Sequence, residues 1–449
     1  MRKFFVFNSL TNKIEEFVPI KEGKASIYVC GPTVYSSPHI GNFRPVIVFD
    51  VLRRALMSIG YEVKFVSNYT DVDDKIINRA KELGISESEL TKGVISEFSS
   101  LVDAVGSLQP DESPRPTVYM DQMLQYIKEL VDKGAAYATP SGDVYFRVQS
   151  DAEYGELSGN TPSSLLSGAR IDVNDEKESP LDFALWKHTE EGIKWQSLWC
   201  EGRPGWHTEC CVMINSIFAD QGGLIDIHGG GFDLKFPHHE NEIAQSRAHN
   251  GHHLANYWMH NGFIAINNEK MSKSLGNVLL TKDVVATFGG MPFRLMILNA
   301  HYRAPVSFSE ETIKEAQSNY AKIETCFRQL AVKLQLENID LNSLSKPDEE
   351  AFLNEICNDL NTPNALSIVY EEIKNANQLL RRRDASLSDL SDSFAKLRDY
   401  FFTLGIKVEY PTLSNEDKAL YGQYLQEKAN KNYAESDRLR ALLQSKGIL

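Results

Sequence analysis

The stretch that decides the fold begins with IYVCGPTVYSSPHIGN at residues 27–42 and reaches a second apolar run, EVKFV, at residues 62–66. Its first four residues, Ile27–Cys30, predict a short buried strand that ends at Gly31 and Pro32. The run at residues 62–66 predicts a second strand of similar length. The segment between the two strands is long enough to hold the helix of a crossover connection.

That intervening segment carries the signals of a helix. Ser37 can cap free backbone N–H groups, Pro38 suits the first helical position, and Gly60 ends the segment. An apolar face follows at helical spacing, formed by Val46, Phe49, Val51, Leu52, Ala55 and Leu56. Strand, helix and strand form a crossover unit, so the sequence predicts an α/β fold with a doubly wound, Rossmann-type parallel sheet in the N-terminal part.

The amino-acid composition changes twice in the middle of the chain. Residues from Pro110 to Trp195 are rich in turn-forming residues and carry only short strands such as Asp143–Val148, which predicts an insertion within the α/β domain. Apolar, strand-like sequence returns at Leu224–Gly231 and again at Tyr257–His260. These two runs are predicted to be strands that follow the insertion.

The C-terminal third is predicted to be helical. Glu310–Leu404 shows a charged helical pattern interrupted at Asn361–Pro363, and further helices are predicted from Asn415 to Gln444. Ser386–Ser393, rich in Ser, Asp and Leu, is predicted to be a loop. We therefore expect an all-α helical bundle followed by a small C-terminal unit.

Length and composition bound the class of protein. A chain of 449 residues suggests about two to four domains, and an apolar fraction of 42% is typical of a globular protein. The net charge of −14 argues against a protein that coats nucleic acid by bulk charge. A local basic patch can still bind nucleic acid on an acidic protein.

The sequence carries no sign of secretion or of a membrane span. Only four apolar residues stand directly before Asn8, too few for a signal peptide, and no run approaches the ~18 apolar residues that a span needs. Six cysteines in 449 residues are too sparse for a disulfide scaffold. We therefore expect a cytoplasmic protein with no membrane partner.

Two short motifs point to a bound nucleotide. The first, PHIGN at residues 38–42, opens the predicted helix, where backbone N–H groups and the helix dipole favour a phosphate. His39 and Asn42 are three residues apart and share a face, and Gly41 leaves room for close approach. The second motif, KMSKS at residues 270–274, carries two ammonium groups that could clamp nucleotide phosphates.

Each motif alone has a structural explanation, because a His often occurs at a helix start and a basic turn is often only solvated. As a pair more than 200 residues apart they are specific, and they resemble the signature of the class I aminoacyl-tRNA synthetases. The family's second His is Asn42 here. Asn42 can donate a neutral hydrogen bond but cannot become a cation, and we expect donation to be sufficient.

Cysteine, histidine and glutamate residues form a candidate metal site. Pro237 marks a helix start, so His238 and Glu242, four residues apart, present a nitrogen and an oxygen to one point. With Cys30 and Cys210 they make a plausible zinc shell that leaves a position for a substrate. Spacing alone does not choose Cys210 over Cys211, or His238 over His239, and each Cys could instead be a buried small hydrophobe.

The stretches around these residues resemble the bacterial cysteinyl-tRNA synthetases over nearly the whole chain, together with NYTDVDDKI at residues 68–76 and HGGGFD at residues 228–233. The resemblance implies one zinc ion per chain, on the ligands Cys30, Cys210, His238 and Glu242. It implies cysteine contacts at Gly31, Thr33, Thr70, Trp206 and Asp233. For Mg-ATP it implies His39, Gly41, Asn42, His228, Gly230 and Lys273, with catalysis by His39, Asn42, Lys273 and Lys270.

The implied reaction activates L-cysteine with ATP to cysteinyl-adenylate and transfers it to the 3′ end of tRNA(Cys). Serine differs from cysteine only by O for S, which a shaped pocket rejects weakly. Zinc selects by softness, because it binds the deprotonated thiol and not the far less acidic hydroxyl. We therefore expect an insertion without editing activity.

The resemblance also implies the domain boundaries. We expect a split catalytic domain at 1–115 and 196–255 and a connecting insertion at 116–195, then a stem-contact segment at 256–312, a helical bundle at 313–405 and a small anticodon-contacting unit at 406–449. We expect a monomer. The alternatives are a cysteine ligase acting on an amino-sugar inositol, a nucleotidyltransferase, and a catalytically weakened synthetase relative that only binds tRNA.

Overall fold

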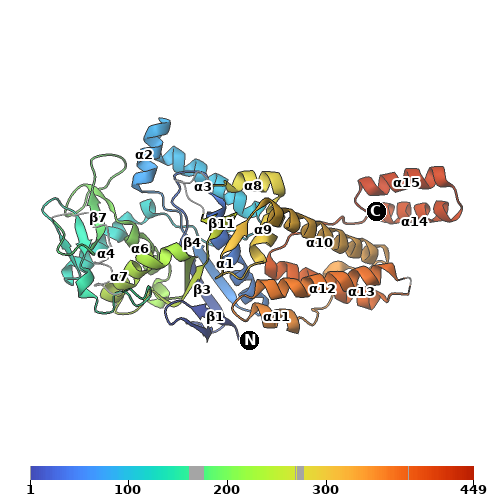
Figure 1. Cartoon of the computed structure of the whole chain (residues 1–449), viewed down its shortest axis with the longest axis horizontal. Coiled ribbons are helices and arrows are strands. Elements are labelled where there is room, and N and C mark those ends of the chain that lie inside the picture. Colours follow the sequence, from blue (N-terminus) through green and yellow to red (C-terminus); the bar gives the residue numbers. More distant parts are fainter. Residues whose placement is uncertain (1, 161–175, 268, 271–277, 383) are drawn as a thin grey trace. The chain divides into compact units, whose positions relative to one another are not determined.

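The computed structural model describes residues 2–160, 176–267, 269–270, 278–382 and 384–449 (Figure 1). The chain divides into two units. The first unit comprises residues 1–287 and 302–307, and the second comprises residues 288–301 and 308–449. The chain therefore passes between the units three times, after residues 287, 301 and 307.

A four-stranded parallel sheet forms the centre of the first unit. Its strands are β3 (Lys24–Val29), β4 (Glu62–Ser67), β9 (Ile225–Gly231) and β10 (Ala255–Asn261), in the order β10-β9-β3-β4. All three pairings are parallel, which confirms the predicted sheet. The chain winds outward in both directions from the β3–β9 pair, and in such sheets ligands bind at the carboxyl ends of the strands beside this switch point.

Helix α1 (Ile40–Ser58) connects β3 to β4 as predicted, but it begins two residues later than expected. His39 is the N-cap residue in place of Ser37. The reason is a short antiparallel pairing, in which the Ile40 N–H donates to the Leu279 carbonyl and the Thr281 N–H donates to the Pro38 carbonyl. The Pro38 carbonyl is thereby used outside the helix.

The insertion contains a four-stranded antiparallel sheet and a helix. The strands are β5 (Ala136–Ala138), β6 (Val144–Phe146), β7 (Phe183–His188) and β8 (Gly202–Pro204), and the helix is α4 (Met120–Asp132). Strand β8 lies beyond the boundary expected at residue 195. The insertion also shares one apolar core with the parallel sheet, because Met123 and Trp186 belong to the same buried cluster as Tyr28 and Ile225.

The remaining elements of the first unit surround these two sheets. They are β1 (Phe5–Asn8), β2 (Lys13–Glu16), α2 (Asp74–Leu83), α3 (Glu87–Ala104), α6 (Trp206–Ile217), α7 (Glu240–Asn250), β11 (Ile264–Ile266), β12 (Glu269–Lys270) and β13 (Val306–Phe308), with α8 (Thr281–Phe288) at the boundary. The buried Arg44 of α1 donates to the backbone carbonyls of Phe263, Tyr302 and Ala304. It fixes the returning segment 302–307 to the first unit.

The second unit is helical, as predicted. It contains α9 (Gly290–Leu298), α10 (Glu310–Leu336), α11 (Glu350–Ile356), α12 (Thr362–Arg381) and α13 (Leu387–Leu404). Stacked rings hold its core, with Phe327 on Phe394 at a centroid distance of 4.6 Å and Phe352 on Tyr400 at 4.2 Å. The expected break at residues 361–363 is the start of α12, where Asn361 is the N-cap residue.

The predicted loop at Ser386–Ser393 is wrong, because these residues begin α13. The Ser386 hydroxyl accepts from the Asp389 N–H at 3.0 Å as an N-cap. Leu390, Phe394 and Leu397 then lie buried at helical spacing. The composition resembled a loop only because the cap and the first turn are polar.

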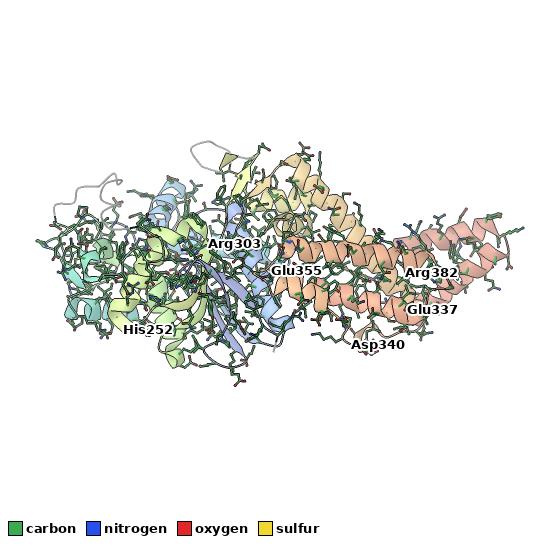
Figure 2. The ribbon with its side chains drawn as sticks, turned by 60° about the horizontal axis from the view of Figure 1, so that its bottom comes forward. His252, Arg303, Glu337, Asp340, Glu355 and Arg382 are labelled. Carbon is green, nitrogen blue, oxygen red and sulfur yellow. The ribbon has the colours of Figure 1, made fainter. Side chains whose placement is uncertain are left out.

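Two short helices, α14 (Asn415–Ala429) and α15 (Tyr433–Ser445), follow where helices were predicted. They pack on a small core of their own with residues of α10. At the end of α12, Arg381 and Arg382 are exposed, and Arg382 pairs with Asp384 at 3.3 Å (Figure 2). Among the described helices, none is long and apolar enough to cross a membrane.

Candidate metal centre and nucleotide cavity

The four candidate zinc ligands come from three places in the first unit. Cys30 directly follows strand β3 at the switch point of the sheet, and Cys210 lies in α6. His238 stands just before α7, and Glu242 lies in the first turn of that helix. The fold therefore brings together residues that are up to 212 positions apart in the sequence.

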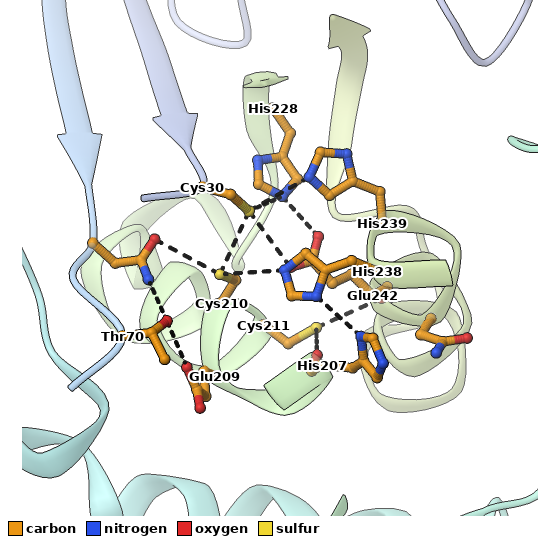
Figure 3. A network of polar contacts seen from close by, with 12 residues as sticks. Cys30, Thr70, His207, Glu209, Cys210, Cys211, His228, His238, His239 and Glu242 are labelled. Carbon is orange, nitrogen blue, oxygen red and sulfur yellow. Dashed lines mark hydrogen bonds and ion pairs between the residues drawn. The ribbon is translucent and has the colours of Figure 1, made fainter. Parts of the chain in front are cut away.

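Their donor atoms lie within 4.8 Å of one another (Figure 3). The Cys30 and Cys210 sulfurs are 3.7 Å apart, and the Cys210 sulfur is 3.9 Å from His238 Nε2. His238 Nε2 is 3.1 Å from Glu242 Oε1. Two thiols, an imidazole and a carboxylate in a buried cluster are a donor set that fits zinc.

A second set of donors overlaps the first. Cys30 and Glu242 also lie close to His228 and His239. His228 Nε2 is 2.8 Å from Glu242 Oε2, and His239 Nε2 is 3.4 Å from the Cys30 sulfur. Both His238 and His239 therefore reach the cluster. Proximity alone does not decide which of the two is the metal ligand.

Cys211 does not join either set. Its sulfur lies 3.6 Å from the His207 carbonyl and 3.7 Å from the Glu242 carbonyl, which turns it to the other side of α6 from Cys210 (Figure 3). Cys211 is fully buried, as is Cys210. The two neighbouring cysteines thus have the same burial but different surroundings.

Burial and neighbouring charges shift the pKa values of the cluster in opposite directions. Burial opposes a charge on His238, but Glu242 outweighs it and raises the pKa of His238 to about 10. Burial likewise opposes a charge on Glu242, yet His238 and His228 hold its pKa well below the usual range. The hydrogen bond from the Cys30 thiol lowers the pKa of Cys210 to about 7, while burial raises the pKa of Cys30. A metal ion bound here would have to displace protons.

A cavity of about 920 Å³ opens at the ends of the strands. Its lining includes all but one of the residues expected to contact cysteine, namely Gly31, Thr33, Trp206 and Asp233, together with Cys30, His39, Gly41 and Asn42. Trp206 is 40% exposed, and its ring stacks on His238 at a centroid distance of 4.2 Å. An open aromatic ring therefore lies over the candidate metal ligands.

Of the expected contact residues that the structure describes, three lie outside the cavity lining. Thr70 is buried and its hydroxyl donates to Glu209 at 3.0 Å. His228 is fully buried between Glu242 and the Tyr28 carbonyl, so both of its ring nitrogens are engaged. Gly230 is packed, since a Cβ there would lie 2.7 Å from Leu234. In this structure His228 lies in the candidate metal cluster, behind the cavity lining.

The nucleotide motif sits at the entry of α1. The Asn42 side-chain oxygen accepts from the His39 backbone N–H at 3.0 Å, which makes Asn42 part of the helix cap. That bond uses the amide oxygen, so the amide nitrogen is the group with which Asn42 could donate to a phosphate. Lys270 is the last residue of β12, and Lys273 lies outside the described residues.

Sequence reasoning gave no role to Asn68, which follows β4. Its side-chain oxygen accepts from the Gly31 N–H at 2.9 Å and lies 3.9 Å from the Cys210 sulfur. Its side-chain nitrogen donates to the Thr70 hydroxyl at 3.3 Å. An available signal was its place directly after a predicted strand, because neighbouring parallel strands end at the same edge of the sheet.

Comparison with known protein families gives two matches. The model of the tRNA synthetases class I (C) catalytic domain matches residues 16–318, and the DALR domain model matches residues 351–406. The chain is 46% identical to the cysteine–tRNA ligase of Acholeplasma laidlawii over 444 residues, 99% of each protein. It is 44% identical to the cysteine–tRNA ligase of Halalkalibacterium halodurans, over 99% of this chain and 96% of that one.

Solved structures with the same fold have low sequence identity. Methionyl-tRNA synthetase of Mycobacterium tuberculosis in complex with methionyl-adenylate superposes with a TM-score of 0.60 at 15% identity, covering 85% of this chain and 89% of that one. A leucyl enzyme, the agnB2 LeuRS of Agrobacterium radiobacter K84 in a ternary complex, gives 0.61 at 11% identity, covering 87% and 85%. These two likenesses concern the fold alone.

Proposed function

This chain belongs to the family of cysteine–tRNA ligases, and from that premise we propose that Cys30, Cys210, His238 and Glu242 bind a zinc ion that selects the thiol of cysteine. As a member of the family, it is an ATP-dependent ligase that joins L-cysteine to tRNA. The observation that carries the zinc proposal is the approach of four donors to within 4.8 Å at the switch point, three of them buried and the fourth, Cys30, half-buried.

We choose the set with both cysteines because two thiolates suit a soft ion better than one does. A zinc ion bound there would supply a Lewis acid that takes a deprotonated thiol and discriminates against the hydroxyl of serine. Trp206 would form one side of the amino-acid site, and the Asp233 carboxylate in the cavity lining could bind the amino group. Gly31 lines the cavity with its backbone, and its missing side chain makes room for the Asn68 carbonyl.

For the activation step, the chain positions two substrates and stabilises charge. The carboxylate of cysteine attacks the α-phosphate of Mg-ATP, and pyrophosphate leaves. His39, the N-cap residue of α1, and Asn42 in its first turn lie where a helix start attracts phosphate. Lys270 and Lys273 would neutralise charge on the leaving pyrophosphate. The ribose hydroxyl of tRNA then attacks the acyl carbon of the adenylate, the bond to the phosphate breaks and AMP leaves, and no side-chain nucleophile is needed.

The remaining assignments are part of the same proposal. We assign the amino-acid site to Gly31, Thr33, Trp206 and Asp233, with Thr70 supporting Gly31 from behind through Asn68. We expect the protein to act as a monomer in the cytoplasm. The DALR match and full-length relatives disfavour the amino-sugar inositol ligase. A nucleotidyltransferase would leave the cluster of thiols without a use.

Cysteine-dependent exchange of pyrophosphate into ATP tests this proposal. The purified protein should contain one zinc ion per chain, exchange pyrophosphate with cysteine, and leave serine unreacted. Removing zinc with a chelator should abolish the exchange, and added zinc should restore it. A metal-independent exchange would refute the zinc assignment, and no exchange at all with tRNA binding intact would indicate a relative that has lost activation.

A further inference from the structure

Glu240 and Asn241 stand between the two ligands His238 and Glu242, and the mechanism above uses neither. Glu240 is the first residue of α7 and is fully buried. Its carboxylate accepts from the Gly155 N–H at 3.0 Å and from the Ser158 N–H at 2.7 Å. The Asn241 side-chain oxygen accepts from the Tyr154 hydroxyl at 2.6 Å. The first turn of α7 thus binds the insertion at three points.

The bound segment, residues 154–160, is shaped for this close fit. Gly155 has φ +100°, and a Cβ there would lie 1.7 Å from the Asn160 carbonyl oxygen. Leu157 is 1% exposed and belongs to the core that the insertion shares with the sheet. Ser158 and Asn160, on the same turn, line the cavity. The segment is therefore a wall of the cavity that is anchored from behind.

The anchor belongs to the amino-acid side of the cavity. Glu240 is two residues from His238 and two from Glu242, and Trp206 stacks on His238. The nucleotide motif, by contrast, lies on α1. Hydrogen bonds from two backbone amides to one carboxylate are charge-assisted, and a carboxylate at a helix start is favoured by the dipole. The anchor is thus strong, and it sits beside the proposed zinc ligands.

We propose that Glu240 is a positioning residue for cysteine, because it holds Ser158 and Asn160 as the wall of the amino-acid site. The inference rests on the proposed function in that cysteine is taken as the ligand of this side of the cavity. It assigns to the insertion a direct part in forming the active site. Within the wall the Ser158 hydroxyl accepts from the Asn160 N–H at 3.3 Å, so the neutral group that the wall presents to the polar backbone of an amino acid is the side-chain amide of Asn160.

The test compares Glu240→Ala and Glu240→Gln with Glu153→Gln as a matched control. Glu153 is on the same insertion, but its carboxylate is 67% exposed and pairs with Arg247 at 3.2 Å. For Glu240→Ala we expect the KM for cysteine to rise about tenfold with little change in kcat, in the KM for ATP or in zinc content. In Glu240→Gln the side chain keeps one acceptor oxygen, so the rise in KM for cysteine should be smaller than in Glu240→Ala. The control should behave as wild type.

Asn160→Ala keeps the inference testable if Glu240→Ala does not fold, because it alters the wall and leaves the buried carboxylate in place. It should raise the KM for cysteine several-fold at unchanged zinc content. Hydrogen exchange at the Gly155 and Ser158 amides should accelerate in Glu240→Gln and stay slow in Glu153→Gln. These amides report on the anchor even if the proposed zinc function fails.

Two results would overturn the inference. One is an unchanged KM for cysteine in both Glu240→Gln and Asn160→Ala. The other is a fall in kcat together with loss of zinc in the Glu240 variants, which would show that Glu240 only supports the metal-binding turn. Unaltered exchange at the two amides in Glu240→Gln would equally refute the anchor.

Discussion

Asn68 connects the two cysteines of the candidate metal centre through one side chain. It accepts from the backbone beside Cys30 and lies against the Cys210 sulfur. Because Asn68 also follows the neighbouring strand, the relative position of the two thiols depends on strand pairing as well as on side chains. The pairing of β3 with β4 therefore helps to set the distance between the two thiols.

The pair Cys210 and Cys211 allows a matched test of the zinc ligands. Cys210→Ser should lower zinc content to less than about a tenth of wild type and abolish cysteine activation, since hydroxyl oxygen is a poor zinc ligand. Cys211→Ser should keep zinc and activity at a modest cost in stability, because its sulfur faces two backbone carbonyls. Metal analysis with pyrophosphate exchange measures both. Equal zinc loss in the two variants would contradict the assignment.

Zinc affinity should rise with pH. In the metal-free protein His238 is protonated at neutral pH, since its pKa is raised to about 10, and Cys30 is protonated because burial raises its pKa. Zinc binding must release about two protons from these groups, so higher pH favours the bound form. Competition with a chelator at pH 6.5, 7.0 and 7.5 measures the slope. An affinity that is flat over this range would contradict the release of protons from His238 and Cys30.

At the scale of single elements, the entry of α1 joins two distant motifs. Residues 38–40 pair with residues 279–281, which follow the KMSKS motif in the sequence. Lys282 also donates to the Ser37 hydroxyl at 3.1 Å. The start of α1 is therefore hydrogen-bonded to the segment that follows the KMSKS motif.

Asn42 caps the start of α1 through its side-chain oxygen, which accepts from the His39 N–H. Asn42→Ala should slow cysteine activation and destabilise the protein by about 1 kcal/mol, because it loses both the cap to His39 and a phosphate donor. Asn42→His should leave the activation rate close to wild type, since a neutral donor suffices. Single-turnover adenylate formation and urea unfolding measure these effects. A large rise in rate with His would show that a cation had been missing.

Gly31 lies where β3 ends and admits no side chain. A Cβ there would be 1.6 Å from the Asn68 carbonyl oxygen. Gly31→Ala should lower the free energy of unfolding by about 2–3 kcal/mol and reduce zinc content, because Cys30 would shift. Gly93→Ala in α3 is the control. Gly93 is exposed with open space around it, so Ala should stabilise the helix by about 0.5–1 kcal/mol. Urea unfolding measures the stability of both variants. An unchanged free energy of unfolding in Gly31→Ala would contradict the close packing.

The elements that sequence reasoning predicted well were those with a single strong pattern. The parallel strands and α1 follow from apolar runs and glycines, whereas the start of α1 was wrong because a segment about 240 residues away pairs with Pro38. Ser386–Ser393 was mistaken for a loop because a polar first turn looks like one. Spacing could not separate His238 from His239, since both residues reach the same sulfur-rich cluster. A non-local contact explains the start of α1 and the assembly of a distant cluster explains the His238/His239 ambiguity, whereas the error at Ser386–Ser393 came from local composition.

At the scale of the whole molecule, the charge of −14 now has a specific consequence for RNA binding. A ligase of this family binds tRNA, so tRNA must meet a locally basic surface on an acidic body. The KM for cognate tRNA should rise only modestly between about 50 and 200 mM KCl, and unrelated RNA should bind weakly. Charging kinetics and filter binding measure both. Tight, steeply salt-dependent binding of unrelated RNA would contradict this expectation.

The three passages of the chain between the two units have a consequence for synthesis on the ribosome. Helix α9, buried along nearly its whole length, belongs to the second unit but is made before residues 302–307 return to the first. The last helix of its bundle, α13, is completed roughly 100 residues later, a delay of about 5–20 s at typical elongation rates. During that interval α9 can pack on α10, but the bond from its buried Arg294 to the Leu404 carbonyl is still missing, so we expect α9 to be a segment on which a chaperone acts.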